Sequence, residues 1–78
     1  MATVKLYAAA RAAAGANELS INAATLEELV ATLKDSHPAL GRVLLQSTYL
    51  LNGTSCKELS TSLSSSDQID IMPRFAGG

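Results

Sequence analysis

The sequence has little of what small domains use as covalent staples or as catalytic groups. Its 78 residues include one cysteine, no tryptophan and three aromatic residues. The lone Cys56 excludes an internal disulfide, and it has neither a second cysteine nor an adjacent histidine to complete a zinc site. A chain of this length folds as one domain with a thin two-layer core, which leaves no room for a deep cofactor cleft.

The sequence also lacks a large excess of positive or negative residues. Six Lys and Arg residues stand against seven Asp and Glu residues, for a formal net charge of −1. The cations are dispersed along the sequence, whereas nucleic-acid binding needs clustered Lys and Arg, so we expect no nucleic-acid partner. No apolar run approaches the roughly 18 to 20 residues of a membrane span, and Lys5 and Arg11 interrupt the apolar start of the chain. We therefore expect no membrane association and a cytoplasmic location.

The first third of the chain predicts two strands and a short helix. Residues 3–7 alternate, which predicts a strand with Val4 and Leu6 facing a core and Lys5 and Tyr7 facing away. The alanine-rich residues 8–14 have high helix propensity and are followed by Gly15, a residue that favours the left-handed conformation at a helix end. Residues 18–21 alternate again and predict a second strand, antiparallel to the first.

The middle of the chain predicts a well-capped helix. Thr25 and Glu28 form a capping box, so the helix begins at Leu26, and Pro38 ends it near Ser36. Its apolar residues fall on one stripe at helical spacing, and they are Leu26, Leu29, Val30 and Leu33. Residues 39–46 repeat a weaker helical spacing, which fits either a second short helix or a packed loop.

The last third predicts a hairpin, a loop and a final strand. Asn52-Gly53 favours a type I′ turn that joins residues 49–51 to residues 54–56. Residues 57–66 are serine-rich and are interpreted as an ordered loop held by Leu59 and Leu63. Residues 68–72 alternate, with Ile69 and Ile71 inward, and the proline at position 73 ends the ladder of hydrogen bonds.

These elements together predict an α+β fold of the β-grasp, ubiquitin-like type. One main helix covers one face of a mixed sheet of four to five strands, which buries every apolar face found above. The domain is expected to span residues 1–72, and residues 73–78 are expected to be a flexible tail that ends in Gly-Gly. Extended, such a tail reaches roughly 20 Å, enough to place a carboxylate in a pocket on another protein. Its glycines let an enzyme close around the terminus without meeting a Cβ.

Over its whole length the chain resembles the small subunit of molybdopterin synthase, a ubiquitin-like sulfur carrier of the MoaD and ThiS type. The resemblance rests on residues 4–11 with the stretch to Gly15, His37-Pro38-Ala39-Leu40, Asn52-Gly53, Leu63 with the turn to Asp67, and Gly77-Gly78. The family ending usually has two prolines before a small aliphatic residue and Gly-Gly. Here Arg74 and Phe75 stand in place of the second proline and the aliphatic residue.

The resemblance implies a carrier subunit of a sulfurtransferase whose active site is on a larger catalytic subunit. An E1-like adenylating enzyme uses ATP to adenylate Gly78, and sulfur from a donor then replaces the adenylate. The resulting thiocarboxylate passes sulfur to a molybdopterin precursor in molybdenum cofactor biosynthesis. No permanently bound cofactor and no metal are expected in the carrier.

The expected partner surface combines one sheet face with the tail. Alternation places Tyr7, Cys56 and Met72 on the face away from the helix, and a semi-apolar exposed face favours docking. With Gly78 as the reacting residue, the expected partner-binding residues are Tyr7, Arg11, Cys56, Met72, Arg74, Phe75, Ala76 and Gly77. Three alternatives stay open, namely a carrier for thiamine or cysteine synthesis, a ubiquitin-like modifier joined to lysines, and a plain binding module.

Overall fold

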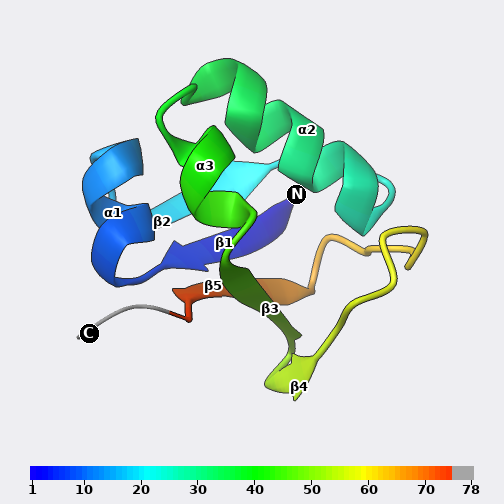
Figure 1. Ribbon diagram of the computed structural model, residues 1–78. Helices are drawn as coiled ribbons and strands as arrows, with labels where there is room; N and C mark the ends of the chain where they lie inside the picture. The colour runs from blue at the N-terminus through cyan, green and yellow to red at the C-terminus, as the bar shows by residue number, and fades with distance from the viewer. Residues whose placement is uncertain (75–78) are drawn as a thin grey trace.

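The computed structural model describes residues 1–74, over which five strands and three helices form (Figure 1). In chain order the elements are β1 (Ala2–Leu6), α1 (Ala8–Ala14), β2 (Glu18–Ile21), α2 (Leu26–Ser36), α3 (Leu40–Leu44), β3 (Ser47–Leu51), β4 (Thr54–Ser55) and β5 (Gln68–Pro73). Of the two interpretations of residues 39–46, the short helix is confirmed and the packed loop is wrong. None of the helices in this part of the chain is long and apolar enough to cross a membrane.

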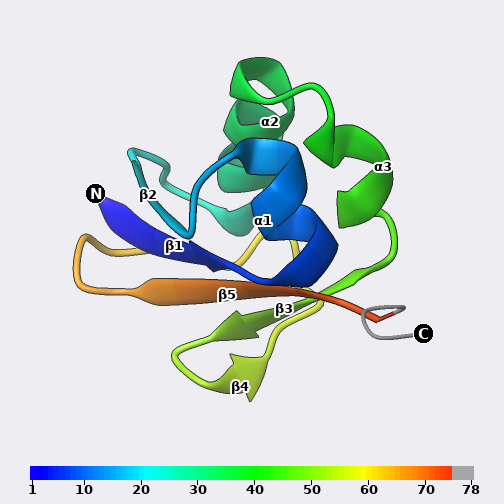
Figure 2. The same ribbon diagram turned by 90° about the vertical axis from the view of Figure 1, so that its left-hand side faces the viewer.

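The strands form one mixed sheet in the order β2-β1-β5-β3-β4. The central strands β1 and β5 run parallel, and every other pairing is antiparallel. All three helices lie over the same face of this sheet (Figures 1 and 2). We call the opposite face, which none of these helices covers, the open face. This arrangement confirms the predicted β-grasp fold.

The core lies between α2 and the two central strands. Val4 and Leu6 of β1 and Ile71 of β5 are at most 2% exposed. Leu29 and Leu33 of α2 are 0% exposed, so the predicted apolar stripe of this helix is the one that faces the sheet. Burying one such side chain contributes on the order of 1.5–3 kcal/mol, which is a large part of the stability of so small a domain.

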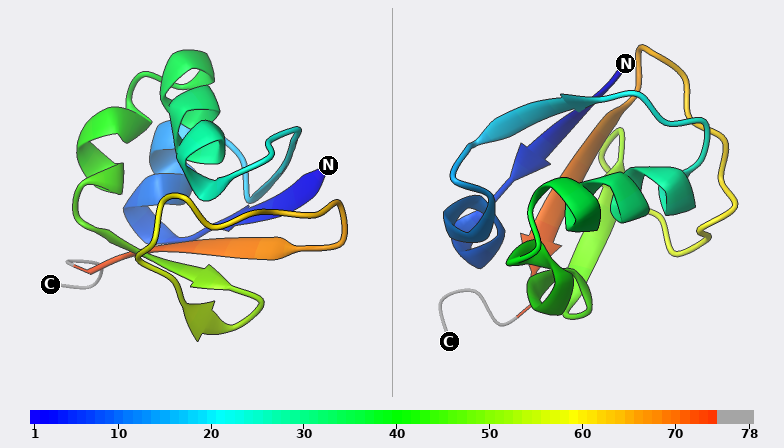
Figure 3. Two further views of the ribbon diagram at one scale, coloured as in Figure 1. Left: turned by 90° about the vertical axis from the view of Figure 1, so that its right-hand side faces the viewer. Right: turned by 90° about the horizontal axis from the view of Figure 1, so that it is seen from above.

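The N-terminus of α2 is held by its cap and by the loop after β4. Thr25 Oγ1 accepts from the Glu28 amide at 3.2 Å, and the Glu28 carboxylate accepts from the Ala24 amide, also at 3.2 Å. The amides of Leu26 and Glu27, which have no partner within the helix, donate to carbonyls of residues 61 and 59 at 3.0 and 2.8 Å. The loop therefore passes beside the start of α2 (Figure 3).

The loop after β4 is held differently from the prediction. Leu63 packs against the core, as expected, but Leu59 is 43% exposed. The prediction that Leu59 anchors the loop is therefore wrong. Its backbone carbonyl makes the contact with α2, and this leaves its side chain free to point outward.

The hairpin turn is as predicted and is tied to the start of β5. Asn52 and Gly53 have φ values of 51° and 89°, the positive angles that a type I′ turn needs. The Asn52 side-chain oxygen accepts from the Gln68 amide at 2.9 Å, and its nitrogen donates to the Asp67 carboxylate at 3.0 Å. Asp67 also accepts from the Ser64 amide at 2.8 Å. These donors lower the pKa of Asp67 below its ordinary value of 3.8.

Candidate functional site

The candidate site lies where β5 ends, at a group of residues that we call the tail base, Met72, Pro73 and Arg74. The strand includes Pro73, one residue further than predicted, and Pro73 is buried opposite Ser47 of β3. The proline nitrogen has no hydrogen to donate, but the next amide, that of Arg74, donates to the Gln46 carbonyl at 2.8 Å. The chain therefore stays attached to the sheet up to Arg74.

Tyr7 and Met72 lie beside one another at this end of the sheet. Leu6 pairs with Ile71 in the parallel register, and the Tyr7 amide donates to the Ile71 carbonyl at 3.2 Å. Since Leu6 and Ile71 face the core, the residues that follow them point toward the open face. Tyr7 is 38% exposed and Met72 is 42% exposed. The predicted parallel pairing of β1 with β5 is thereby confirmed, and it brings Tyr7 beside Met72 at the end of the sheet.

Arg11 and Arg74 follow Tyr7 and Met72 closely in the chain, on separate elements. Tyr7 is the N-cap residue of α1, and its carbonyl accepts from the Ala10 and Arg11 amides at 3.0 and 3.4 Å. Arg11 is exposed one helical turn beyond Tyr7, and Arg74 is exposed directly after β5. Two cations and two semi-apolar side chains thus come from the adjoining ends of α1 and β5. The remaining predicted partner-binding residues, Phe75, Ala76 and Gly77, and the reacting Gly78 lie outside the described residues.

Cys56 is not part of this group, which corrects the prediction for its position. The two-residue turn places Leu51 opposite Thr54 and Leu50 opposite Ser55, and the Cys56 amide donates to the Tyr49 carbonyl at 2.8 Å. Cys56 therefore shares the face of Tyr49, which pairs with the core-facing Ile71. It is half-buried against the core, on the helix side of the sheet. The face of a hairpin strand depends on the turn register, and three consecutive apolar residues in β3 hid that register in the sequence.

Sequence reasoning also missed Tyr49 and the groove beside it. The Tyr49 hydroxyl donates to the Leu44 carbonyl at 3.1 Å, and burial raises the pKa of this tyrosine. The groove has a volume of about 770 Å³ and lies between α2, α3 and the β3–β4 hairpin. Lys34, Lys57 and Arg74 all line it. Cations that are dispersed in the sequence therefore gather in space, which the spacing argument could not show.

The tail base provides no catalytic group of its own. Within residues 1–74 no three His, Cys, Asp or Glu side chains gather closely enough to hold a metal ion. Tyr7, Met72 and Arg74 supply apolar contact and charge, which are the means of binding another protein.

Comparisons with known proteins agree with the fold described above. The model of the ThiS family matches residues 4–78. No curated protein sequence matches the chain significantly. The solution structure of the small archaeal modifier protein 1 from Methanosarcina acetivorans is similar, with 31% identity and a TM-score of 0.87, over 99% of this chain and 95% of that one.

Two further solved structures are similar. SAMP1 from Haloferax volcanii has 25% identity and a TM-score of 0.84, over 99% of this chain and 98% of that one. The complex of subunits 1 and 2 of the molybdopterin-converting factor from Helicobacter pylori contains a chain with 26% identity and a TM-score of 0.77. That match covers 99% of this chain and 97% of the other.

Proposed function

The chain belongs to the ThiS family, and from this premise we propose that it is the sulfur-carrying small subunit of a molybdopterin synthase. In this proposal the carboxyl group of Gly78 becomes a thiocarboxylate and donates its sulfur to a molybdopterin precursor. The carrier supplies the reacting group, and a larger subunit supplies the active site. The carrier is therefore one part of an enzyme and not an enzyme alone.

One observation carries the proposal: the strand that leads to the reacting end passes beside Tyr7, so that Tyr7 and Met72 are both exposed where the tail begins. The parallel pairing of β1 and β5 brings Met72 next to Tyr7 and directs the chain off the end of the sheet there. The family match continues from this point through Gly78. A partner that binds Tyr7 and Met72 is thus held directly at the start of the segment that carries the reacting group.

The proposed chemistry needs no side chain of the carrier. A carboxylate is a poor electrophile until one of its oxygens belongs to a good leaving group. An activating enzyme joins the Gly78 carboxylate to AMP from ATP and releases pyrophosphate. Hydrosulfide supplied by a sulfur donor then attacks the acyl carbon, AMP leaves with the carbon–oxygen bond broken, and a thiocarboxylate remains. The residues of this chain have two tasks, which are to bind each partner and to present the carboxyl group.

The Helicobacter pylori structure supports a protein partner, because it is a complex of subunit 1 with subunit 2 of the molybdopterin-converting factor. The proposed contact in this chain is the open face around Tyr7 and Met72. Their exposed fractions of 38% and 42% leave apolar area that a partner can bury. Methionine adapts its shape to different surfaces, which suits a carrier that visits an activating enzyme and a synthase in turn.

A second candidate function is a protein modifier joined through Gly78 to lysines of target proteins. The 31% identity to the small archaeal modifier protein 1 of Methanosarcina acetivorans favours it. The first step, adenylation of Gly78, is the same in both candidates. The product distinguishes them, because a modifier ends in an isopeptide bond and a carrier ends in a free thiocarboxylate.

Deletion of Gly78 tests the proposal in a host that lacks its own small subunit of molybdopterin synthase. The full chain should restore molybdenum cofactor synthesis, and the chain without Gly78 should restore none. Ser20→Ala, an exposed change on the distant strand β2, serves as the matched control and should restore synthesis fully. Synthesis restored by the truncated chain would sink the proposal. If the full chain also fails to restore cofactor synthesis, and conjugates of it are found on host proteins, the modifier is favoured.

A further inference from the structure

A second surface suited to binding lies on the helix side of the molecule, and neither Tyr7 nor Met72 lines it. It is the groove of about 770 Å³ between α2, α3, the β3–β4 hairpin and the loop after β4. Tyr49 and Cys56 form part of its lining and face the helix side. Thr48, which pairs with Met72, and Arg74 of the tail base also line it, so the groove reaches from the helix side to the edge of the open face.

Two strongly exposed leucines line this groove. Leu45 follows α3 and is 74% exposed, and Leu59 lies in the loop after β4 and is 43% exposed. The other large hydrophobic residues exposed among residues 1–74 are Met1, Tyr7 and Met72, and none of them lines the groove. Neither leucine is needed for the core. Two exposed leucines in one groove, together with the half-buried Tyr49, indicate a site for apolar side chains of a partner.

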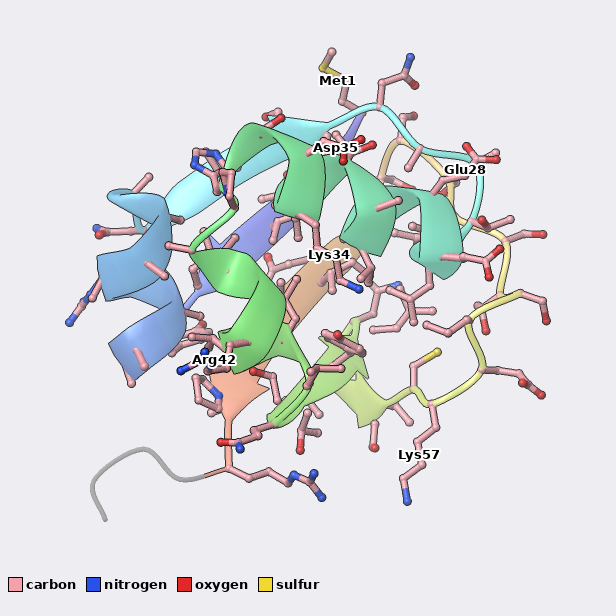
Figure 4. The ribbon with its side chains drawn as sticks, turned by 45° about the horizontal axis from the view of Figure 1, so that its top comes forward. Met1, Glu28, Lys34, Asp35, Arg42 and Lys57 are labelled. Carbon is pink, nitrogen blue, oxygen red and sulfur yellow. The ribbon has the colours of Figure 1, made fainter. Side chains whose placement is uncertain are left out.

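The charges around the groove have one sign. Half of the six cations of the chain, Lys34, Lys57 and Arg74, line it, and no Asp or Glu among residues 1–74 does. In Figure 4 Lys34 extends from α2 on the side of the β3–β4 hairpin, and Lys57 extends outward beyond β4. The acidic residues Glu27 and Asp35 line a smaller neighbouring groove that shares Val30, Lys34 and Leu59. Lys57 and Arg74 therefore line the main groove alone, whereas Lys34 is shared with a groove that carries acidic residues.

The edge of β3 also lies open along this groove. β4 pairs with Leu50 and Leu51, and the Cys56 amide extends the pairing to Tyr49. Ser47 and Thr48 pair with β5 on one side, and within residues 1–74 no strand pairs with them on the other. Both residues line the groove. An extended segment is the form of chain that such an edge accepts.

We propose that this groove binds an extended segment of a partner protein in which apolar residues alternate with Asp or Glu. The apolar side chains contact Leu45 and Leu59, and the carboxylates pair with Lys57 and Arg74. The inference goes beyond the proposed function, because it does not involve Gly78. Tyr7 and Met72 do not line the groove, whereas Arg74 of the tail base does, so a partner bound here lies next to the surface proposed for the synthase.

The test uses the full ¹⁵N-labelled chain and a short capped peptide that alternates Leu with Asp. Matched peptides replace every Asp by Asn or by Lys. Titration followed by NMR should give saturable shifts at the amides of Leu45, Cys56 and Leu59 with the Asp peptide, weaker ones with Asn and none with Lys. Lys57→Glu should weaken binding by at least about fivefold, whereas Arg42→Glu, an exposed reversal outside the groove, should change it less than about twofold.

Leu45→Ser and Leu59→Ser probe the apolar part of the contact. Both side chains are exposed, so these changes should leave the melting temperature unchanged while they weaken peptide binding. The proposal is overturned if the Asp peptide gives no saturable shifts, if it shifts Tyr7 and Met72 instead, or if the Lys peptide binds equally well. It is also overturned if the groove amides shift with protein concentration alone or on deletion of residues 75–78. Those results would identify a second copy or the chain's own end as the occupant.

Discussion

Tyr7 and Met72 are adjacent on the open face because the Tyr7 amide donates to the Ile71 carbonyl at 3.2 Å and so fixes the register of β1 against β5. Both side chains are more than one-third exposed, at 38% and 42%. Two residues 65 positions apart in the sequence thereby form one contact surface at the start of the tail. The proposed carrier function depends on this relationship, because a partner has to recognise the folded domain and the reacting end together.

Changing both Tyr7 and Met72 to Asp should weaken binding to the larger synthase subunit and to the activating enzyme by more than about 2 kcal/mol. Two buried carboxylates without partners would make the interface unfavourable, whereas in the free protein both positions meet water. Titration calorimetry measures the affinity, and thermal unfolding should show nearly the same melting temperature. Ser20→Asp on β2 is the control and should bind normally. Unchanged affinity of the double variant would remove Tyr7 and Met72 from the interface.

Leu29→Ala and Leu33→Ala should each lower the free energy of unfolding by about 2–5 kcal/mol, because both side chains are completely buried against the sheet. Asp35→Ala, on the exposed side of the same helix, should change it by less than about 0.5 kcal/mol. Urea unfolding of the three variants gives the comparison. A cost below that of the control for either leucine would mean that α2 does not pack as described.

The stability of the hairpin should depend on pH through Asp67. Hydrogen bonds from the Ser64 amide and from Asn52 lower the pKa of Asp67 below 3.8 in the folded state. A lowered pKa means that the carboxylate stabilises the fold above the unfolded-state pKa and that this contribution is lost as the pH falls through the folded-state pKa. Asp67→Asn should therefore be less stable than the wild type at neutral pH, and the difference should shrink below about pH 4.

Urea midpoints measured across this pH range test the contribution of Asp67. Asn52→Gly keeps a residue that tolerates the positive φ of 51° but removes one donor to Asp67. Its acid-side loss of stability should begin at a higher pH than that of the wild type. Parallel curves for the wild type and Asp67→Asn would show that this carboxylate contributes nothing to the pH dependence.

Local patterns in the sequence predicted most of the fold. The capping box at Thr25, the stripe through Leu29 and Leu33 and the turn at Asn52-Gly53 each act within a few residues, so their consequences can be worked out from the sequence alone. The adjacency of Tyr7 and Met72 followed once β1 and β5 were taken as parallel.

Long-range pairing decided the features that sequence reasoning missed. Cys56 faces the helices because Tyr49 lies opposite it, and the alternation within residues 49–51 gives no sign of which face is buried. Leu59 is exposed because the backbone of the loop, and not its side chain, contacts α2. Lys34, Lys57 and Arg74 line one groove because α2, the loop after β4 and the end of β5 converge there. None of these relationships has a signature in local spacing.

Intact mass spectrometry of the protein isolated from its native host shows whether Gly78 carries sulfur. We expect a species in which one oxygen has been replaced by one sulfur, and fragmentation should locate the change at Gly78. Growth without the sulfur source should remove this species, and deletion of Gly78 should prevent it. A protein found unmodified under conditions of active cofactor synthesis, or found joined through Gly78 to lysines of other proteins, would contradict the account.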